Sequence, residues 1–243
     1  METVEKVALV TGAARRVGRA IALELARAGC DVAVHCRQSA KDAAHLVDEI
    51  RDMGRRAVVV AGDLANPETP NRIVAEAVRN LGRLDVLVNN ASIFEKTPLE
   101  QADAAAWERI LRINTIAPAL LAQAAAPFMR QAGAGRIVNL IDILAERPIK
   151  RHGPYCASKA ALSALTRSLA LELAPEITVN GIAPGIAVFP ENYDEDLRSR
   201  LTANVPLKRT GSPEQIAALV RFLVTEGDYI TGQIIAVDGG MSL

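Results

Sequence analysis

Short apolar runs alternate with amphipathic segments along the whole chain. Runs rich in Val, Ile and Ala predict seven strands, at residues 7–10, 31–35, 57–61, 84–89, 135–141, 177–182 and 233–238. Helical patterns lie between them, including residues 17–28, residues 40–53 and a helix that begins near residue 68. Apolar runs of this length, separated by helices, are typical of parallel strands buried on both faces. The pattern predicts an α/β fold, a Rossmann-type doubly wound parallel sheet of about seven strands.

The alternation continues without a low-complexity linker or an internal repeat, so residues 1–243 are expected to form one domain. The segment 184–211 is different, because it is rich in proline and acidic residues and lies between two regular regions. Two interpretations are open. The segment is a substrate loop that closes over a bound molecule, or it is a solvated connection with a short helix of its own.

Composition narrows the class of protein. Half of the residues are hydrophobic and 3% are aromatic, which suits Ala-rich helices packed on buried strands. Lys plus Arg and Asp plus Glu both number 28, so the charge gives no reason to expect nucleic acid or an anionic membrane as a partner. The start METVEKVALV lacks the basic flank and long apolar core of a signal peptide, and no apolar run could span a bilayer. A cytoplasmic location is therefore expected.

The three cysteines favour free thiols in a reducing compartment. Cys30, Cys36 and Cys156 are odd in number and lack metal-ligand spacing, so we expect packing residues and no metal site.

The first strand is followed by TGAARRVGRA, which predicts a phosphate-binding turn. Gly12 and Gly18 allow close approach of the backbone, and the helix that follows presents free N–H groups. The second strand ends in HCRQS instead of an acidic residue that would bind the ribose 2′-hydroxyl of NAD. Arg37, together with Arg16 and Ser39, therefore indicates a 2′-phosphate and NADP(H) as the cofactor.

Further polar residues follow later strands at the same sheet edge. Asp63 is a candidate contact for an adenine amino group, or a turn or N-cap residue before the next helix. His35 is a candidate contact for the adenosine or a packed edge residue. Asn89, Asn90 and Ser92, in VLVNNAS, suit contact with the cofactor's ribose.

The stretch YCASK places Tyr155 and Lys159 on one face of a helix. A phenol near an ammonium is a plausible proton donor for hydride transfer, and Lys159 is expected to lower the pKa of Tyr155. In INTIAPALL, Pro118 has no N–H for the carbonyl of Asn114, so that carbonyl is free to hold a water on a proton route. His152, three residues before the tyrosine, is a candidate titrating group.

TGAARRVG, NNAS, Asn114, YCASK and IAPG together strongly resemble the short-chain dehydrogenase/reductase superfamily, over essentially the whole chain. The resemblance implies a single Rossmann-type domain, a homotetramer or dimer, and catalysis by Asn, Ser, Tyr and Lys. Asn114, Tyr155 and Lys159 match, whereas Asp142 stands at the serine position. Asp142 and Arg16, with Phe94 shortly after NNAS, look like the pteridine reductase branch, which reduces dihydropteridines such as dihydromonapterin.

The branch implies that Phe94 stacks on a pterin ring, although an ordinary hydrophobic plug is equally open, and that Asp142 and Tyr155 contact the substrate. Tyr155, Lys159, Asn114 and Asp142 are the predicted catalytic residues. The expected activity is NADPH-dependent reduction of a dihydropterin, dihydrofolate or oxidised pterin, by a homotetramer. A reductase of ketones, 3-oxoacyl thioesters or quinones is the alternative, and a non-catalytic NADP(H) sensor is a third. The predicted cofactor-binding residues are Gly12, Arg15, Arg16, Val17, Gly18, His35, Arg37, Ser39, Asp63, Leu64, Asn90, Ala91, Ser92, Tyr155, Lys159, Pro184, Gly185 and Ile186.

Overall fold

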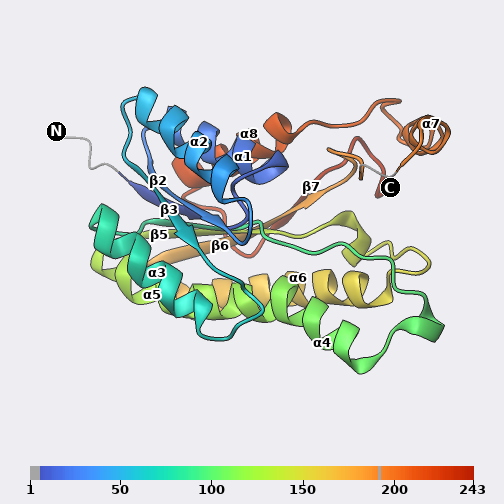
Figure 1. Ribbon diagram of the computed structural model, residues 1–243, viewed down its shortest axis with the longest axis horizontal. Coiled ribbons are helices and arrows are strands. Elements are labelled where there is room, and N and C mark those ends of the chain that lie inside the picture. Colours follow the sequence, from blue (N-terminus) through green and yellow to red (C-terminus); the bar gives the residue numbers. More distant parts are fainter. Residues whose placement is uncertain (1–5, 191–192) are drawn as a thin grey trace.

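A seven-stranded parallel sheet runs through the middle of the computed structural model, which describes residues 6–190 and 193–243 (Figure 1). The strand order is β3-β2-β1-β4-β5-β6-β7, and every neighbouring pair is parallel. The strands are β1 (Val7–Val10), β2 (Asp31–Cys36), β3 (Ala57–Ala61), β4 (Val86–Asn89), β5 (Gly135–Leu140), β6 (Ile177–Pro184) and β7 (Ile234–Val237). The predicted doubly wound sheet of seven strands is confirmed.

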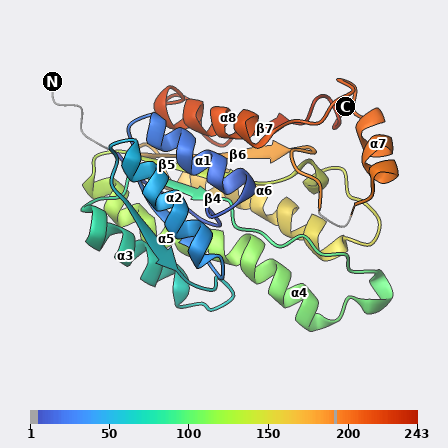
Figure 2. The same ribbon diagram turned by 45° about the horizontal axis from the view of Figure 1, so that its top comes forward.

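Helices cover both faces of the sheet, as Figures 1 and 2 show. One face carries α1 (Arg16–Arg27), α2 (Ala40–Asp52) and α8 (Pro213–Thr225). The other face carries α3 (Thr69–Leu81), α5 (Ala117–Gln131) and α6 (Gly153–Leu173), with α4 (Ala104–Leu111) extending beyond the sheet. Successive strand residues point to opposite faces. Ala8 and Val10 therefore pack under the first set of helices, while Val7 and Leu9 pack under the second.

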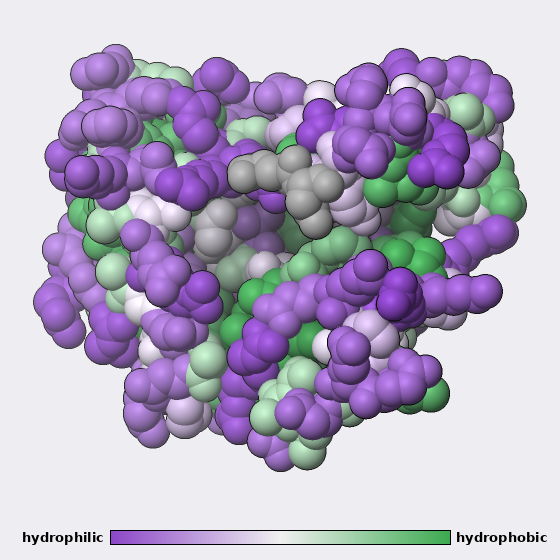
Figure 3. Space-filling model, turned by 45° about the vertical axis from the view of Figure 1, so that its right-hand side comes forward, coloured by the Kyte–Doolittle hydropathy of each residue, from purple (hydrophilic) through white to green (hydrophobic). Residues whose placement is uncertain are grey.

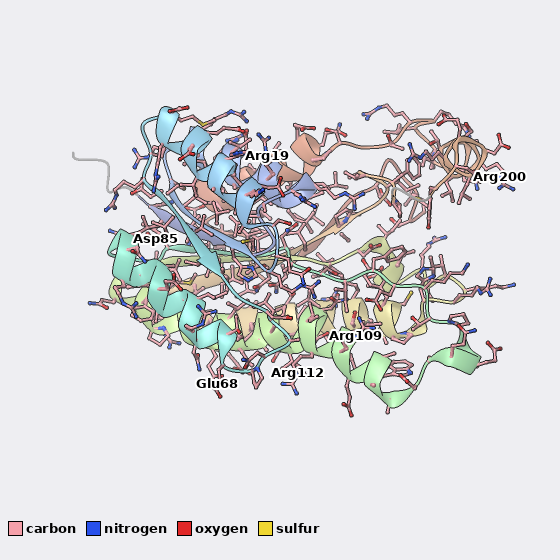
Figure 4. The ribbon with its side chains drawn as sticks, in the orientation of Figure 1. Arg19, Glu68, Asp85, Arg109, Arg112 and Arg200 are labelled. Carbon is pink, nitrogen blue, oxygen red and sulfur yellow. The ribbon has the colours of Figure 1, made fainter. Side chains whose placement is uncertain are left out.

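Several strand ends differ from the prediction. β4 begins at Val86, two residues after the predicted start, and the carboxylate of Asp85 just before it accepts the N–H of Val7 at 2.8 Å and pairs with Arg83. Figure 4 labels Asp85 at the end of the sheet where the chain enters β1. β6 extends to Pro184, two residues past the predicted end. That extension carries the chain directly into the segment 184–211.

The segment 184–211 contains a helix, α7 (Glu195–Ala203), begun by Asp194, whose side chain accepts the N–H of Leu197 at 2.8 Å. No residue of α7 is buried. Residues 191 and 192 of this segment lie outside the described residues. A short helix matches one of the two interpretations of the segment, and its role as a substrate loop stays a prediction.

Across residues 6–190 and 193–243, none of the helices combines the length and apolar character needed to cross a membrane.

Candidate active site

A cavity of about 510 Å³ lies at the carboxyl ends of the strands. The cavity spans the place at which the strand order reverses. The chain places β2 and β3 on one side of β1 and then returns to place β4 on the other side. Ligands of open α/β sheets bind at this switch point. Figure 3 looks toward this end of the molecule and shows a hollow with hydrophobic residues on its walls. Most of the predicted cofactor residues line the cavity: Gly12, Arg15, Arg16, Val17, Gly18, His35, Arg37, Asp63, Leu64, Asn90, Ala91, Ser92, Tyr155, Lys159, Pro184 and Gly185.

The glycine turn is shaped by close packing against the end of β4. Gly12 has a φ of 61°, a left-handed conformation that favours glycine. A Cβ on Gly18 would lie 2.3 Å from the Gly12 carbonyl oxygen and 2.6 Å from Nδ2 of Asn90. That amide donates to the carbonyls of Thr11 and Gly12, at 2.8 and 3.1 Å. Asn90 therefore holds the predicted phosphate turn against β4.

Arg16 occupies the first position of α1 in a left-handed conformation, with a φ of 54°. Such a conformation costs a non-glycine residue about 1 kcal/mol or more. The guanidinium donates through Nη2 to the carbonyl of Phe189 at 2.9 Å, which connects the phosphate turn to the segment after β6. The first turn of α1 has no acidic residue, so the partial positive charge of its N-terminus stays available to an anion.

His35 is buried and connects two turns of the cavity wall. Its Nδ1 accepts the N–H of Gly12 at 3.1 Å, and its Nε2 lies 3.1 Å from the carbonyl of Gly62. Because a carbonyl can only accept, Nε2 carries the proton. Burial lowers the pKa of His35 to about 4, so the ring is neutral at pH 7. His35 is thus both a packed edge residue and a wall residue of the cavity.

Acidification should destabilise the protein through His35. Burial lowers the pKa of His35 from 6.5 to about 4. The contribution of the neutral ring to the free energy of unfolding is therefore complete above pH 6.5 and is lost as the pH falls toward 4. The loss amounts to about 3 kcal/mol, because the unfolded chain binds the proton first. We expect His35→Asn, whose amide can accept and donate without titrating, to weaken this part of the pH dependence. Urea unfolding between pH 7 and 4.5 measures it, and identical slopes in the two proteins would contradict the assignment.

Arginines gather at the predicted nucleotide end. Arg37, after β2, is exposed and lines the cavity, and Arg15 lines it while pairing with Asp42 at 2.6 Å. Ser39 precedes α2 and does not line the cavity, and its contact with a 2′-phosphate stays a prediction. With Arg16 and the N-terminus of α1, these cations suit a phosphorylated nucleotide such as NADP(H).

Two other predicted residues take backbone roles. The Asp63 carboxylate accepts the N–H of Ala65 at 2.9 Å, which makes it a turn residue and not a helix cap, and it also lines the cavity. Ile186 does not line the cavity, and its carbonyl accepts the N–H of Gly211 at 2.9 Å. The Asn89 side chain is buried within the sheet, where its amide N–H donates to Oδ1 of Asn139 at 2.8 Å.

Tyr155 and Asp142 form a hydrogen-bonded pair at the other end of the cavity. The Tyr155 hydroxyl donates to Oδ2 of Asp142 at 2.7 Å, while Oδ1 accepts the N–H of Leu144 at 2.9 Å. Asp142 lies two residues past β5 and Tyr155 lies in the first turn of α6, so the two come from different elements. One turn along α6, Lys159 donates to the carbonyl of Leu140 at 2.8 Å. All three side chains line the cavity.

Burial shifts the pKa of all three groups. It raises the pKa of Asp142, against the hydrogen bonds from Leu144 and Tyr155 and the charge of Lys159. It raises the pKa of Tyr155 well above 10, helped by the adjacent Asp142, and lowers that of Lys159 to about 8. The expected lowering of the Tyr155 pKa by Lys159 is therefore wrong for this structure. The phenol stays protonated at neutral pH, which suits a proton donor.

Asn114 lies behind the cavity and does not line it. It belongs to a π-helix, Arg112–Ile116, which directly precedes α5 and its Pro118. Its side chain accepts the N–H of Ile93 at 3.0 Å and donates to Ile93 carbonyl and Ser158 hydroxyl oxygens. Asn114 thus fixes the chain after β4 against α6. Its catalytic role through a bound water stays a prediction.

Phe94 presents an exposed aromatic ring to the cavity. The ring is 41% exposed and stacks on His152, with the ring centroids 4.6 Å apart and the planes at 13°. It meets Tyr155 edge-on, at 4.8 Å and 85°. A hydrophobic plug would be buried, so the exposed ring agrees better with a stacking surface.

Sequence reasoning missed the apolar and backbone part of the wall. These residues follow strand ends or lie on neighbouring helices, and their types carry no chemical signal. They are Gly62, Ile93, Ile113, Leu140, Ile141 and Ile216, whereas Ala187 and Val188 lie in the segment 184–211 that was a candidate substrate loop. A position at or after the ends of strands β3, β4 and β5 was the one signal that could have found most of the missed residues.

No cluster of three or more His, Cys, Asp or Glu side chains suited to a metal ion occurs in the part of the chain that the structure describes.

Comparison with known proteins agrees with this geometry. The family described as Enoyl-(Acyl carrier protein) reductase matches residues 12–242. The chain is 37% identical to the short-chain dehydrogenase/reductase FrzI of Cladobotryum sp., over 98% of this chain and 96% of the relative. It is also 37% identical to the 3-oxoacyl-[acyl-carrier-protein] reductase FabG of Staphylococcus epidermidis, over 97% of this chain and 98% of that one.

One solved structure that is similar to this chain contains NADP. FolM Alternative dihydrofolate reductase 1 from Brucella canis, complexed with NADP, has a TM-score of 0.92 and 35% identity, covering 98% of this chain and 94% of that one. The NADP of that neighbour agrees with NADP(H) as the cofactor predicted from Arg16 and Arg37. Fold, cavity and relatives lead to one conclusion: the chain belongs to the short-chain dehydrogenase/reductase superfamily.

Proposed function

We propose that this protein reduces a pteridine with NADPH, converting a dihydropterin to its tetrahydro form, or acting on dihydrofolate or an oxidised pterin. The observation that carries the proposal is the 2.7 Å hydrogen bond between Tyr155 and Asp142 at a cavity wall. A pterin offers N–H donors and basic ring nitrogens, which a carboxyl can accept from or protonate. The exposed ring of Phe94 supplies a flat surface beside this pair. The similarity to the FolM structure supports the same assignment.

Tyr155 and Asp142 act together as the proton source in this proposal. The reduced ring nitrogen takes its proton from the Tyr155 hydroxyl, and a protonated Asp142, whose Oδ2 lies 2.7 Å from that hydroxyl, would return a proton to Tyr155. Burial raises the pKa of both groups, which keeps the proton on the pair to a higher pH than exposed groups would. The pair therefore delivers a proton without first forming a phenolate.

NADPH would supply the hydride that the ring carbon receives. The turn at Gly12 to Gly18 and the arginines at 15, 16 and 37 would hold its phosphates, and Asn90, Ser92 and Lys159 its nicotinamide ribose. The Lys159 ammonium, held by the Leu140 carbonyl, is positioned along the same wall as Tyr155. These side chains would keep the nicotinamide next to the proton-donating pair.

A carbonyl reductase is the second candidate. The relative from Staphylococcus epidermidis is named a 3-oxoacyl-[acyl-carrier-protein] reductase, and ketones, 3-oxoacyl thioesters and quinones are the substrates to compare. An ionised Asp142 argues against this class, because a carboxylate would repel the developing alkoxide charge, whereas a protonated Asp142 would stand in for the family's serine. A non-catalytic NADP(H) sensor is the third candidate, and the Tyr155–Asp142 pair argues against it.

Steady-state turnover decides between the two reductases. With NADPH, we expect kcat/KM for 7,8-dihydrobiopterin or dihydrofolate to exceed that for an acetoacetyl thioester or a quinone, measured by loss of NADPH absorbance. Methotrexate should raise the melting temperature when NADPH is present. Turnover of the carbonyls without turnover of any pterin would overturn the proposal in favour of the second candidate.

The assembly and the location follow the family habit in this proposal. We propose a cytoplasmic homotetramer in which exposed apolar residues become buried between subunits. Leu171 on α6 is 84% exposed in the single chain, which supports a contact of this kind. We further propose that the segment 184–211 contributes to the substrate side of the site, since Ala187 and Val188 line the cavity.

A further inference from the structure

The backbone around Phe94 is held in place on both sides of that residue. Ile93 exchanges two hydrogen bonds with the Asn114 amide, at 3.0 and 3.1 Å. The carboxylate of Glu95 receives both terminal nitrogens of Arg109, at 2.5 and 2.7 Å. Figure 4 labels Arg109 on α4, below the sheet. With the backbone held, the orientation of the Phe94 ring depends on the side chains around it.

His152 covers one face of that ring. The near-parallel stack places the imidazole 4.6 Å from the Phe94 centroid, and the Tyr155 ring meets Phe94 at 85°. Phe94 lines the cavity, whereas His152 does not and is only 9% exposed. One face of Phe94 is therefore backed by the imidazole, while 41% of the residue stays exposed and the residue lines the cavity.

His152 is itself rigidly placed. Its Nδ1 donates to the carbonyl of Lys150 at 3.0 Å, and its own carbonyl accepts the N–H of Cys156 at 2.9 Å. The neighbouring N–H of Thr97 donates to the carbonyl of Arg151 at 2.6 Å, which joins the Phe94 segment to the residues before α6. His152 directly precedes α6, and the first turn of that helix carries Tyr155. The imidazole thus connects the aromatic surface to the element that carries the proton donor.

We propose that His152 is a positioning residue that holds Phe94 flat against a planar two-ring heteroaromatic substrate. An unsupported phenyl ring in an irregular segment would rotate among several orientations, and each bound substrate would have to order it. The Phe94 ring, because it is stacked on His152, is already ordered before the substrate binds. This selects a flat, rigid ring system over a flexible carbonyl chain, which gains little from stacking. The inference rests on the proposed pteridine reduction and names a residue that sets its substrate class.

His152→Ala tests the inference through a split between kinetic constants. We expect the KM for a dihydropterin to rise about tenfold, in line with the loss of one aromatic stack, with kcat within about twofold of the parent. The dissociation constant of NADPH, from fluorescence titration, should not change. His152→Phe should restore the KM, because a phenyl ring can stack without the imidazole's hydrogen bond. The control is His45→Ala, on the exposed side of α2 and outside the cavity.

Three outcomes separate the possibilities. Pterin turnover with an unchanged KM in His152→Ala overturns the inference and leaves the proposed function standing. A KM that rises in His152→Ala and stays high in a folded His152→Phe, judged by circular dichroism, also overturns it, because stacking would then not be the cause. Absence of pterin turnover by the unmodified protein overturns the proposed function, and with it the substrate named here.

Discussion

Replacing Asp142 with serine is expected to lower kcat/KM for a dihydropterin by about 100-fold or more. General acid catalysis is worth about 10² to 10⁴ in rate, and a serine hydroxyl is far too weak an acid to return a proton to Tyr155. The same change restores the neutral hydroxyl that the family has at this position and that suits a developing alkoxide, so turnover of a 3-oxoacyl thioester or a quinone should rise. Asp142→Ser therefore changes the ratio of the two activities, and steady-state kinetics with both substrate classes measures that ratio.

Asp142→Asn is the matched control for Asp142→Ser. Its amide oxygen can still accept the N–H of Leu144, so local structure is kept while the acid is lost. A retained pterin rate in Asp142→Asn would contradict the proton-source role.

The pH profile gives an independent readout of the same carboxyl. In the unmodified protein, kcat/KM should fall as the pH rises through the raised pKa of Asp142, and this limb should be absent from both variants. A further loss of kcat/KM is expected above pH 8. Burial lowers the pKa of Lys159 to about 8, so the ammonium loses its charge there.

The sheet could be predicted from the chain because its signal is local. Each strand is a short apolar run, and β1 and β2 are buried at every position. The predicted strand ends were less accurate, because they depend on partners that lie far apart in the sequence. Asp85, just before β4, accepts the N–H of Val7, a partner 78 residues away. Contacts over such a separation leave no periodic pattern in the sequence.

The candidate site divides in the same way. Motif positions predicted Tyr155, Lys159 and Asp142, and all three line one cavity. Their protonation could not be predicted from spacing, since burial, which is a property of the whole fold, raises the pKa of Tyr155 above the value that a nearby lysine alone implies. The left-handed conformation of Arg16 and its bond to Phe189 also depend on packing across 173 residues.

Tyr155→Phe is expected to lower kcat for the reduction by about 10² to 10⁴-fold while leaving NADPH binding intact. The ring keeps its edge contact with Phe94, and only the hydroxyl that donates to Asp142 is removed. Asp142 then loses a hydrogen bond that lowers its pKa, so it stays protonated to a higher pH than in the parent. It nevertheless lacks the group that lies between it and the substrate in the proposed proton route. Single-turnover kinetics and a fluorescence titration with NADPH measure the two quantities separately.

Tyr229→Phe is the matched control, because Tyr229 is fully exposed and does not line the cavity. It should leave both kcat and NADPH affinity unchanged. If Tyr155→Phe retained the parent rate, Tyr155 would not be the proton donor, and Asp142 would have to reach the substrate directly. If neither protein turned over any pterin or carbonyl while both bound NADPH equally, the sensor alternative would be favoured. Loss of turnover with intact binding is the combination expected of a reductase in which the Tyr155 hydroxyl serves proton transfer, because the rest of the proposed nucleotide site is unchanged in Tyr155→Phe.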